Sequence, residues 1–379
     1  MKTVVESLAA LLRPELAELT AYVPHVVPGI EVKLDANEAP PARSPAIREA
    51  VTKALAHVEL ERYPDPRALR LKAAIEKRTG APADTLIFGS GSDELIALVV
   101  NALAVPRKKG APAVVLTPTP TFVMYRMTSR CHGIKPVEVP LDRSWDLDVD
   151  STKRAIAMME PNVVFVASPN NPTGNRMSDD RVRDVVAACG TEQNAAFAIV
   201  DEAYVDYAAE GSLRGLRATQ PHLGILRTLS KIGLAALRVG WLEADAGLVT
   251  EIDKTRQPFN LSATSQAAAA AVLEDDDAWS AVRAEAAAIV KARGELATAI
   301  DALEGFSVTP SSANFLWVKT PGPAEPVFAH LAKDGILVRS FHAGGGRLGS
   351  QIRITIGNDA ENARLLESLR KVPATGLGG

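Results

Sequence analysis

Two side chains of reactive type stand thirty residues apart, each at the end of an apolar run. They are Asp201 in A-I-V-D-E-A-Y and Lys231 in R-T-L-S-K. A lysine can form an imine with an aldehyde and afterwards move protons as acid and base. A carboxylate at the end of an apolar strand is costly without a partner, and a cationic ring nitrogen would be such a partner. The alternative role for Asp201 is to cap a following helix.

A glycine-rich turn, G-S-G-S-D-E-L-I at residues 89–96, follows another apolar run. A helix that begins at Ser92 or Asp93 would direct free backbone N–H groups toward an anion such as a phosphate. Ser230 and Arg238, on either side of Lys231, could bind the same phosphate, the arginine through its planar fork. An ordinary strand–helix turn capped by Ser92 is the alternative explanation of the glycines.

Hydrogen-bond donors stand near further strand ends. Asn171 in S-P-N-N-P-T-G carries an amide that can donate to a phenolate oxygen, and Tyr204, three residues after Asp201, could reach the same atom. Arg353 in Q-I-R-I-T-I-G lies in an expected strand, where it suits bidentate binding of a carboxylate. The alternatives are a plain turn around Asn171 and an exposed edge-strand position for Arg353.

These groups match the needs of one cofactor, pyridoxal phosphate. Its aldehyde reacts with a lysine, its pyridine nitrogen stays protonated beside a carboxylate, and its phosphate needs an anion site. The sequence therefore predicts that Lys231 forms the imine and that Asp201 holds the ring nitrogen.

Short apolar runs alternate with helical patterns between about residues 84 and 245, which predicts an α/β sheet with crossover helices. Several runs are continuously apolar, as in strands covered on both faces. The expected strands are Leu86–Phe88, Ala113–Thr117, Val137–Pro140, Val163–Ala167, Ala196–Val200, Ile225–Leu229 and Val239–Glu243. The expected helices between them include Asp93–Ala104, Ser151–Met158 and Ser178–Cys189.

The pattern changes after Pro258. Alanine-rich helices are expected at Ala267–Leu273 and Ala281–Leu303, the second long enough to act as a spine. They precede strands at Phe315–Val318 and Ile352–Ile356 and helices at Ala324–Lys333 and Ala360–Arg370. This texture predicts a smaller α+β domain, onto which the N-terminal segment packs. The expected division is a large domain at residues 46–265 and a small domain built from residues 1–45 and 266–379.

Composition limits the function classes. The chain has 379 residues, 47% of them hydrophobic and 23% charged, which suits a globular protein of roughly two domains. A net charge of −3 with mixed signs gives no support for nucleic-acid binding. Cys131 and Cys189 form no metal or disulfide framework, and no signal peptide or apolar run of membrane-spanning length is visible. A cytoplasmic protein without a metal, nucleic-acid or membrane partner is expected.

The motifs together resemble those of the fold type I pyridoxal-phosphate aminotransferases over nearly the whole chain, and among them the histidinol-phosphate aminotransferases. The resemblance is carried by K-L-D-A-N-E-A-P at 33–40, R-Y-P-D-P at 62–66, G-S-G-S-D-E at 89–94, T-L-S-K and R-I-T-I-G. It implies a large domain with a mostly parallel seven-stranded sheet flanked by helices, a smaller α+β domain, and a homodimer with shared active sites.

Roles are carried over by position. Lys231 resembles the imine-forming lysine and Asp201 the partner of the pyridinium. The other cofactor ligands implied are Asn171 and Tyr204 at O3′, Phe122 on the ring, and Ser92, Asp93, Ser230, Arg238 and Tyr63 at the phosphate, Tyr63 from the neighbouring subunit. The substrate contacts implied are Arg353 at a carboxylate, Arg339 and Tyr22 at the substrate's phosphate, and Asn314.

Three positions depart from the family pattern. Phe122 stands where many relatives have a tyrosine, so stacking on the ring survives but a hydroxyl hydrogen bond does not. Ala39 replaces the second asparagine of the usual A-N-E-N-P. Lys231 and Arg238 are seven residues apart, one fewer than in many relatives, so the role of Arg238 requires a tightened loop.

The implied activity is a ping-pong amino transfer between glutamate and imidazole-acetol phosphate, which gives histidinol phosphate in histidine biosynthesis. An aromatic aminotransferase or a phospho-amino-acid decarboxylase would keep the same lysine, aspartate and arginine, so these remain alternatives. A regulatory protein with an aminotransferase-like domain is a third, disfavoured because no DNA-binding segment is evident.

Overall fold

The computed structural model describes residue 8 and residues 11–19, 27–41, 44–191 and 194–375. Within these residues the larger sheet has seven strands in the order β2-β8-β7-β6-β5-β3-β4. They are β2 (Leu86–Ser90), β3 (Val114–Thr119), β4 (Lys135–Pro140), β5 (Val163–Ala167), β6 (Phe197–Asp201), β7 (Leu223–Thr228) and β8 (Val239–Glu243). Among them β8 alone runs in the opposite direction to the other strands. The predicted mostly parallel α/β sheet is confirmed.

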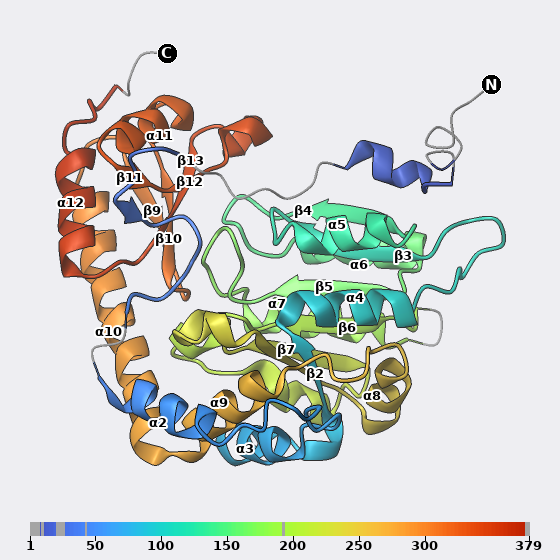
Figure 1. The fold of residues 1–379 in the computed structure, drawn as a ribbon. Coiled ribbons are helices and arrows are strands. Elements are labelled where there is room, and N and C mark those ends of the chain that lie inside the picture. The colour runs from blue at the N-terminus through green and yellow to red at the C-terminus, as the bar shows by residue number, and fades with distance from the viewer. Residues whose placement is uncertain (1–7, 9–10, 20–26, 42–43, 192–193, 376–379) are drawn as a thin grey trace.

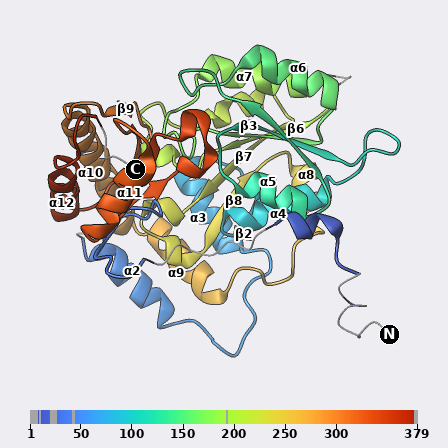
Figure 2. The same ribbon diagram turned by 90° about the horizontal axis from the view of Figure 1, so that it is seen from above.

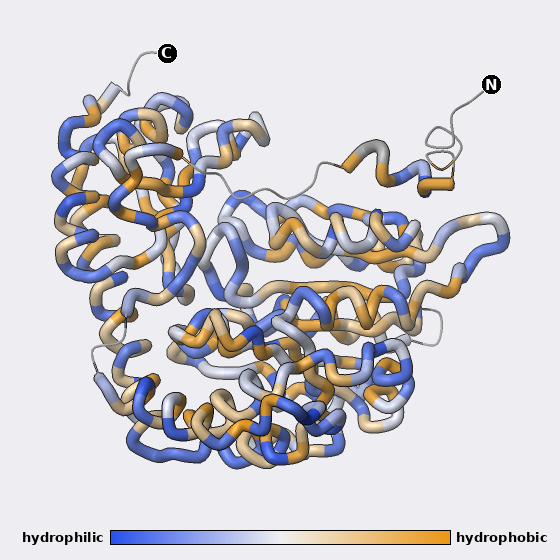
Figure 3. Tube along the Cα trace, viewed as in Figure 1, coloured by the Kyte–Doolittle hydropathy of each residue, from blue (hydrophilic) through white to orange (hydrophobic). Residues whose placement is uncertain are grey.

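Helices cover both faces of this sheet (Figures 1 and 2). Val163 and Phe165 of β5 join a core with α4 (Ser92–Ala102), α5 (Met124–Cys131) and α8 (Ala246–Asp253). The alternate residues, such as Val164, pack instead with helices on the other face, α6 (Val149–Met159) and α7 (Asp179–Cys189). Because both faces of the central strands are buried, a strand such as β5 is continuously apolar, and the central strands are correspondingly orange in Figure 3.

A second sheet forms the smaller α+β part of the molecule. Within the described residues its order is β12-β13-β10-β9, all antiparallel. Its strands are β9 (Ser307–Thr309), β10 (Phe315–Lys319), β12 (Arg339–Ser340) and β13 (Gln351–Thr355), beside the helices α11 (Ala324–Lys333) and α12 (Asp359–Leu369). Strand β1 (Val32–Lys33) pairs in parallel with β11 (Ile336–Leu337), so the N-terminal segment lies among C-terminal elements (Figure 1).

The helix α10 (Asp276–Asp301) connects the two parts. Its buried face shares one continuous core with the second sheet and with α9 (Ala263–Glu274), against which α2 (Ala46–Leu55) and α3 (Leu69–Thr79) also pack. The predicted boundary after residue 265 therefore falls inside α9, and the domain division stays a prediction. No helix in the described part of the chain has the length and apolar character that a bilayer crossing requires.

A buried carboxylate, that of Glu243, lies at the end of β8. Glu243, whose side chain is 3% exposed, accepts hydrogen bonds at its Oε1 from Arg214 Nη2 at 2.8 Å and from Arg217 Nη1 at 2.6 Å. Both arginines come from the 3-10 segment Leu213–Ala218, which precedes β7. These ion pairs fix that segment against the antiparallel strand.

Replacement of Glu243 by Ala should lower the free energy of unfolding by about 3 kcal/mol, because it leaves two partly buried guanidinium groups without their anion. Urea denaturation of the cofactor-free chain measures this loss. The matched control is Glu274→Ala, which breaks the more exposed pair with Arg70. That change should cost less than about 1 kcal/mol. Equal losses in the two variants would contradict the interpretation.

Candidate active site

The sheet brings the predicted residues to one edge. Strands β5, β6 and β7 are parallel, so Asn171, Asp201 and Lys231, which lie at or just after their carboxyl ends, collect on the same side. Strand β8 runs in the opposite direction, and Arg238, directly before its first residue, therefore reaches this edge as well. One reversed strand thus adds a cation to a site built by parallel strands.

Asp201 is the last residue of β6 and is 5% exposed. Its Oδ2 accepts the Tyr125 hydroxyl hydrogen at 2.6 Å, and its Oδ1 accepts the Ala203 N–H at 2.9 Å. Burial raises the pKa of the Asp201 carboxyl to about 6, although both donors act in the opposite direction. The carboxylate is ionised at neutral pH only at a cost, so it provides a strong binding site for a cation.

Lys231 lies in the short 3-10 turn Ser230–Ile232 that follows β7. Its Nζ lies 5.8 Å from the centre of the Tyr204 ring, and its backbone oxygen accepts the Tyr207 hydroxyl at 2.5 Å. Tyr204 is 5% exposed, and its hydroxyl oxygen accepts a hydrogen bond from Asn37 Nδ2 at 2.9 Å. The amine and the phenol are therefore neighbours, as their predicted roles require.

The glycine-rich turn meets Arg238. Gly91 has a φ of +79°, which favours glycine, and a Cβ there would lie 2.4 Å from Arg238 Nη2 and displace the guanidinium. Helix α4 begins at Ser92. Arg238 has a φ of +52° and directs its guanidinium to Ser230 Oγ at 3.5 Å and to the backbone oxygen of Ser90 at 3.4 Å. The 3-10 turn Ala235–Leu237 directly precedes Arg238 in this short loop.

Asp93, in the first turn of α4, is an unusual neighbour for an anion site. Its Oδ2 lies 3.9 Å from Arg238 Nη2, and its Oδ1 is buried without a hydrogen-bond partner. Burial raises the pKa of its carboxyl, while Arg238 and Lys231 act in the opposite direction. The side chain therefore lies beside the arginine, and the backbone N–H groups at the helix start are the donors that could bind an anion.

Arg353 is central in its sheet, so the alternative of an exposed edge-strand arginine is wrong. Strand β13 lies between β12 and β10, and Arg353 is 9% exposed. Its Nη1 donates to Asn171 Oδ1 at 2.6 Å and its Nη2 donates to the Asp35 backbone oxygen. Arg339 pairs directly with Arg353 across β12 and β13 and is exposed. The two arginines therefore lie side by side on one face of the sheet.

The other predicted residues lie around this centre. Phe122 packs edge-on against Tyr125, with ring centres 5.7 Å apart. Asn314 is 1% exposed and donates through Nδ2 to the Asn37 backbone oxygen at 3.0 Å, while its Oδ1 has no partner. Tyr63 is 82% exposed and stacks on Phe259 at 4.6 Å. Tyr22 lies outside the described residues.

Sequence reasoning missed two residues that touch this group, Tyr125 and Asn37. Asn37 belongs to the motif K-L-D-A-N-E-A-P, and Tyr125 stands three residues after Phe122. Nothing in the spacing of Tyr125 from Asp201, or of Asn37 from Tyr204, indicates contact, because each pair is far apart in the chain and only the fold joins it.

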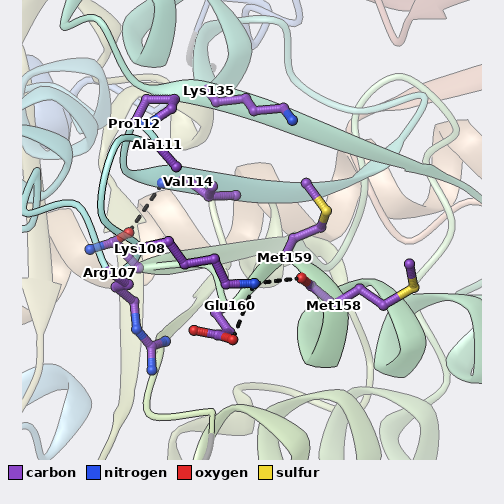
Figure 4. Close-up of a pocket in the computed structure, with 10 residues that line it drawn as sticks. Arg107, Lys108, Ala111, Pro112, Val114, Lys135, Met158, Met159 and Glu160 are labelled. Carbon is purple, nitrogen blue, oxygen red and sulfur yellow. Dashed lines mark hydrogen bonds and ion pairs between the residues drawn. The ribbon is translucent and has the colours of Figure 1, made fainter.

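A cavity of about 100 Å³ lies elsewhere, at the amino ends of β3 and β4 (Figure 4). Lys108 crosses it to donate to the Met158 backbone oxygen at 3.0 Å and to pair with Glu160 at 3.2 Å. Asn162 bonds to Val114 N–H and to the Val105 backbone oxygen. These contacts join the loop before β3 to the end of α6, so the cavity is separate from the candidate site.

Comparison with known proteins shows the family to which the chain belongs. The family model for aminotransferase class I and II matches residues 30–369. Histidinol-phosphate aminotransferase 2 of Nitrosococcus oceani is 37% identical over 368 residues, which cover 96% of this chain and 98% of that protein. The histidinol-phosphate aminotransferase of Chromobacterium violaceum is 38% identical over 362 residues, 95% of this chain and 97% of that one.

Among solved structures, histidinol-phosphate aminotransferase from Sinorhizobium meliloti in complex with pyridoxal-5′-phosphate has a TM-score of 0.82 at 26% identity. The match covers 95% of this chain and 96% of that one. The protein is thus an aminotransferase. It belongs to the class I and II aminotransferase family, whose cofactor is pyridoxal phosphate.

The residues of the site fit that cofactor. The buried Asp201 carboxylate requires a cation such as a pyridinium, and Lys231 supplies an amine beside it. Arg238, Ser230 and the start of α4 form an anion site at a glycine where a side chain would collide. An aldehyde, a basic ring nitrogen and a phosphate are the three functions that these groups can hold.

The pKa of Asp201 predicts a pH-dependent cost in the cofactor-free chain. A carboxyl that titrates near 6 when folded and near 3.8 when unfolded makes folding less favourable as pH rises from about 4 to 6, by about 3 kcal/mol in all. Asp201→Asn removes this cost. The variant should therefore gain stability relative to the parent between pH 4 and pH 7, and urea denaturation at several pH values measures the difference. A difference independent of pH would contradict it.

Proposed function

We propose that this aminotransferase interconverts histidinol phosphate and 2-oxoglutarate with imidazole-acetol phosphate and glutamate, in histidine biosynthesis. The names of its relatives support this substrate pair. The observation that carries the proposal is the pairing of Arg339 with Arg353. Like charges directly opposite each other in a sheet repel, and an anionic substrate bound between these two arginines would offset that repulsion.

The two arginines bind different anionic groups of the substrates. Glutamate carries two carboxylates, whereas histidinol phosphate carries a phosphate and no carboxylate. Arg353, fixed by Asn171 and Asp35, binds the carboxylate next to the reacting carbon. Arg339, more exposed, binds the phosphate of histidinol phosphate, together with Tyr22. Asn314 completes the substrate side.

Pyridoxal phosphate, when bound, supplies an electron sink for the bond that breaks at the amino carbon. Asp201 keeps the pyridine nitrogen protonated. Asn171 and Tyr204 donate to the phenolate oxygen, Phe122 covers the ring, and Lys231 Nζ takes and returns the proton of the reacting carbon. The phosphate is held by the backbone N–H groups of Ser92 and Asp93 and by the side chains of Ser230, Arg238 and the partner's tyrosine.

We further propose a cytoplasmic homodimer in which Tyr63 completes the neighbour's phosphate site. Tyr63, Leu60 and Phe259 expose large apolar surface, with 82%, 83% and 39% of each residue accessible. Such exposure of neighbouring apolar side chains is typical of a surface that is covered in the assembly. The large and small domains at residues 46–265, and at 1–45 with 266–379, remain part of this proposal.

Arg339→Leu should lower kcat/KM for histidinol phosphate about 10- to 100-fold, as the loss of a charge-assisted hydrogen bond predicts. The rate with phenylalanine should stay within about threefold, since phenylalanine carries no phosphate. Single-turnover absorbance changes of the loaded enzyme with each amino donor measure both. Arg370→Leu, at the exposed end of α12, is the matched control and should change neither rate. A parent enzyme that prefers phenylalanine would refute the substrate but not the aminotransferase activity.

Co-expression of Lys231→Ala and Tyr63→Ala chains should restore activity that neither variant has alone. A mixed dimer contains one site with an intact lysine and an intact tyrosine from the other chain. If Tyr63 served its own chain, every site would lack one group, and the mixed preparation would be no more active than the average of the two variants. Steady-state rates of the purified mixed dimers decide between these outcomes.

A further inference from the structure

Asn37 lies at the centre of a buried hydrogen-bond network beside Tyr204. It is 1% exposed and has a φ of +56°. Its Nδ2 donates to the Tyr204 hydroxyl oxygen at 2.9 Å, and its backbone oxygen accepts from Asn314 Nδ2 at 3.0 Å. Its backbone N–H donates to Thr355 Oγ1 at 3.0 Å, and Thr355 Oγ1 donates back to Asn37 Oδ1 at 3.2 Å.

The hydroxyl of Thr355 fixes which way the Asn37 amide points. In this orientation the hydroxyl accepts one N–H and donates its own hydrogen to Asn37 Oδ1. With the amide reversed, the hydroxyl would face two N–H donors and its hydrogen would lose that acceptor. Thr355 is 2% exposed, so an unsatisfied hydroxyl there would be costly. The amide N–H group therefore faces Tyr204.

A phenol oxygen that accepts from Asn37 cannot donate its single hydrogen to Asn37. We propose that Asn37 is a positioning residue, which directs the Tyr204 hydroxyl hydrogen onto the phenolate oxygen of the cofactor. This proposal rests on the proposed role of Tyr204 as a donor to that oxygen. Without Asn37 Nδ2, the hydroxyl would be free to rotate toward other acceptors.

The same segment also supports the substrate arginine. The backbone oxygen of Asp35, two residues earlier, accepts from Arg353 Nη2, and the backbone oxygen of Leu34 accepts from Thr355 N–H at 2.9 Å. Strand β1 is held by β11. The segment that carries Asn37 is therefore bound both to β11 and to β13. This fixes the position of the Asn37 amide next to Tyr204.

The decisive variant is Asn37→Asp, which has nearly the same shape but presents only acceptors when ionised. Tyr204 should then donate to the new carboxylate and release the phenolate oxygen. A donor to the phenolate stabilises the more negative, deprotonated form of the bound cofactor. Its loss should raise the pH midpoint of the cofactor's absorbance change by about one unit. Titration of the loaded enzyme without any amino donor measures the midpoint.

A double-mutant cycle separates this effect from the added charge. In a Tyr204→Phe background, Asn37→Asp should shift the midpoint much less, because no hydroxyl remains to be redirected. Equal shifts in the two backgrounds, or no shift in either, would overturn the proposal. Asn362→Asp is the matched control. Asn362 is also a buried small-domain asparagine, bonded to Gly357 at both amide atoms, and its substitution should leave the midpoint unchanged.

Asn37→Gly serves if the aspartate variant fails to fold, since glycine tolerates a φ of +56°. It should give a smaller upward shift that likewise disappears in the Tyr204→Phe background, and a shift that persists there would overturn the proposal. The titration uses no substrate, so failure of histidinol phosphate as a substrate leaves this test intact. Absence of any cofactor absorbance would instead refute the proposed function itself.

Discussion

The buried carboxylate of Asp201 is the constraint around which the site is organised. Strand β6 is covered on both faces, so its last residue is removed from water together with the apolar residues before it. Burial raises the pKa of Asp201 to about 6, and the Tyr125 hydroxyl and the Ala203 N–H only partly compensate. The fold thereby keeps a charge that the protein satisfies only in part, and a cationic ring nitrogen would complete it.

Groups on other strands depend on the same edge. Parallel strands bring Asn171 and Lys231 to the same edge as Asp201, and the reversed strand β8 brings Arg238 to that edge as well. A ring with a nitrogen at one end and a phosphate at the other suits a site with an acid and an arginine at separate positions. Segments outside this sheet also reach the group, since Arg353 of the second sheet donates to Asn171 and Asn37, which follows β1, donates to Tyr204.

Much of this could be predicted from the sequence because it is local. The strands β5 and β8 have the predicted bounds, and the others differ at their ends by a few residues. The one shift that affects the site is in β6, which includes Asp201 where the sequence placed the strand end at Val200. An apolar run shows roughly where a strand lies. The last residue of the strand, however, is set by hydrogen bonds to the neighbouring strands. Here Ala167 and Leu226 extend β6 by pairing with Asp201.

The sequence by itself determined the chemical groups and the succession along the chain of the strands that carry them, because reactive side chains at the ends of apolar runs are visible without a fold. Tertiary structure decided which groups touch. Tyr125 and Asn37 reach their partners across 76 and 167 residues of chain. Arg353 is central and not peripheral because β12 and β10 flank its strand. Such contacts depend on strand direction and sheet order, which long-range packing sets and no local pattern encodes.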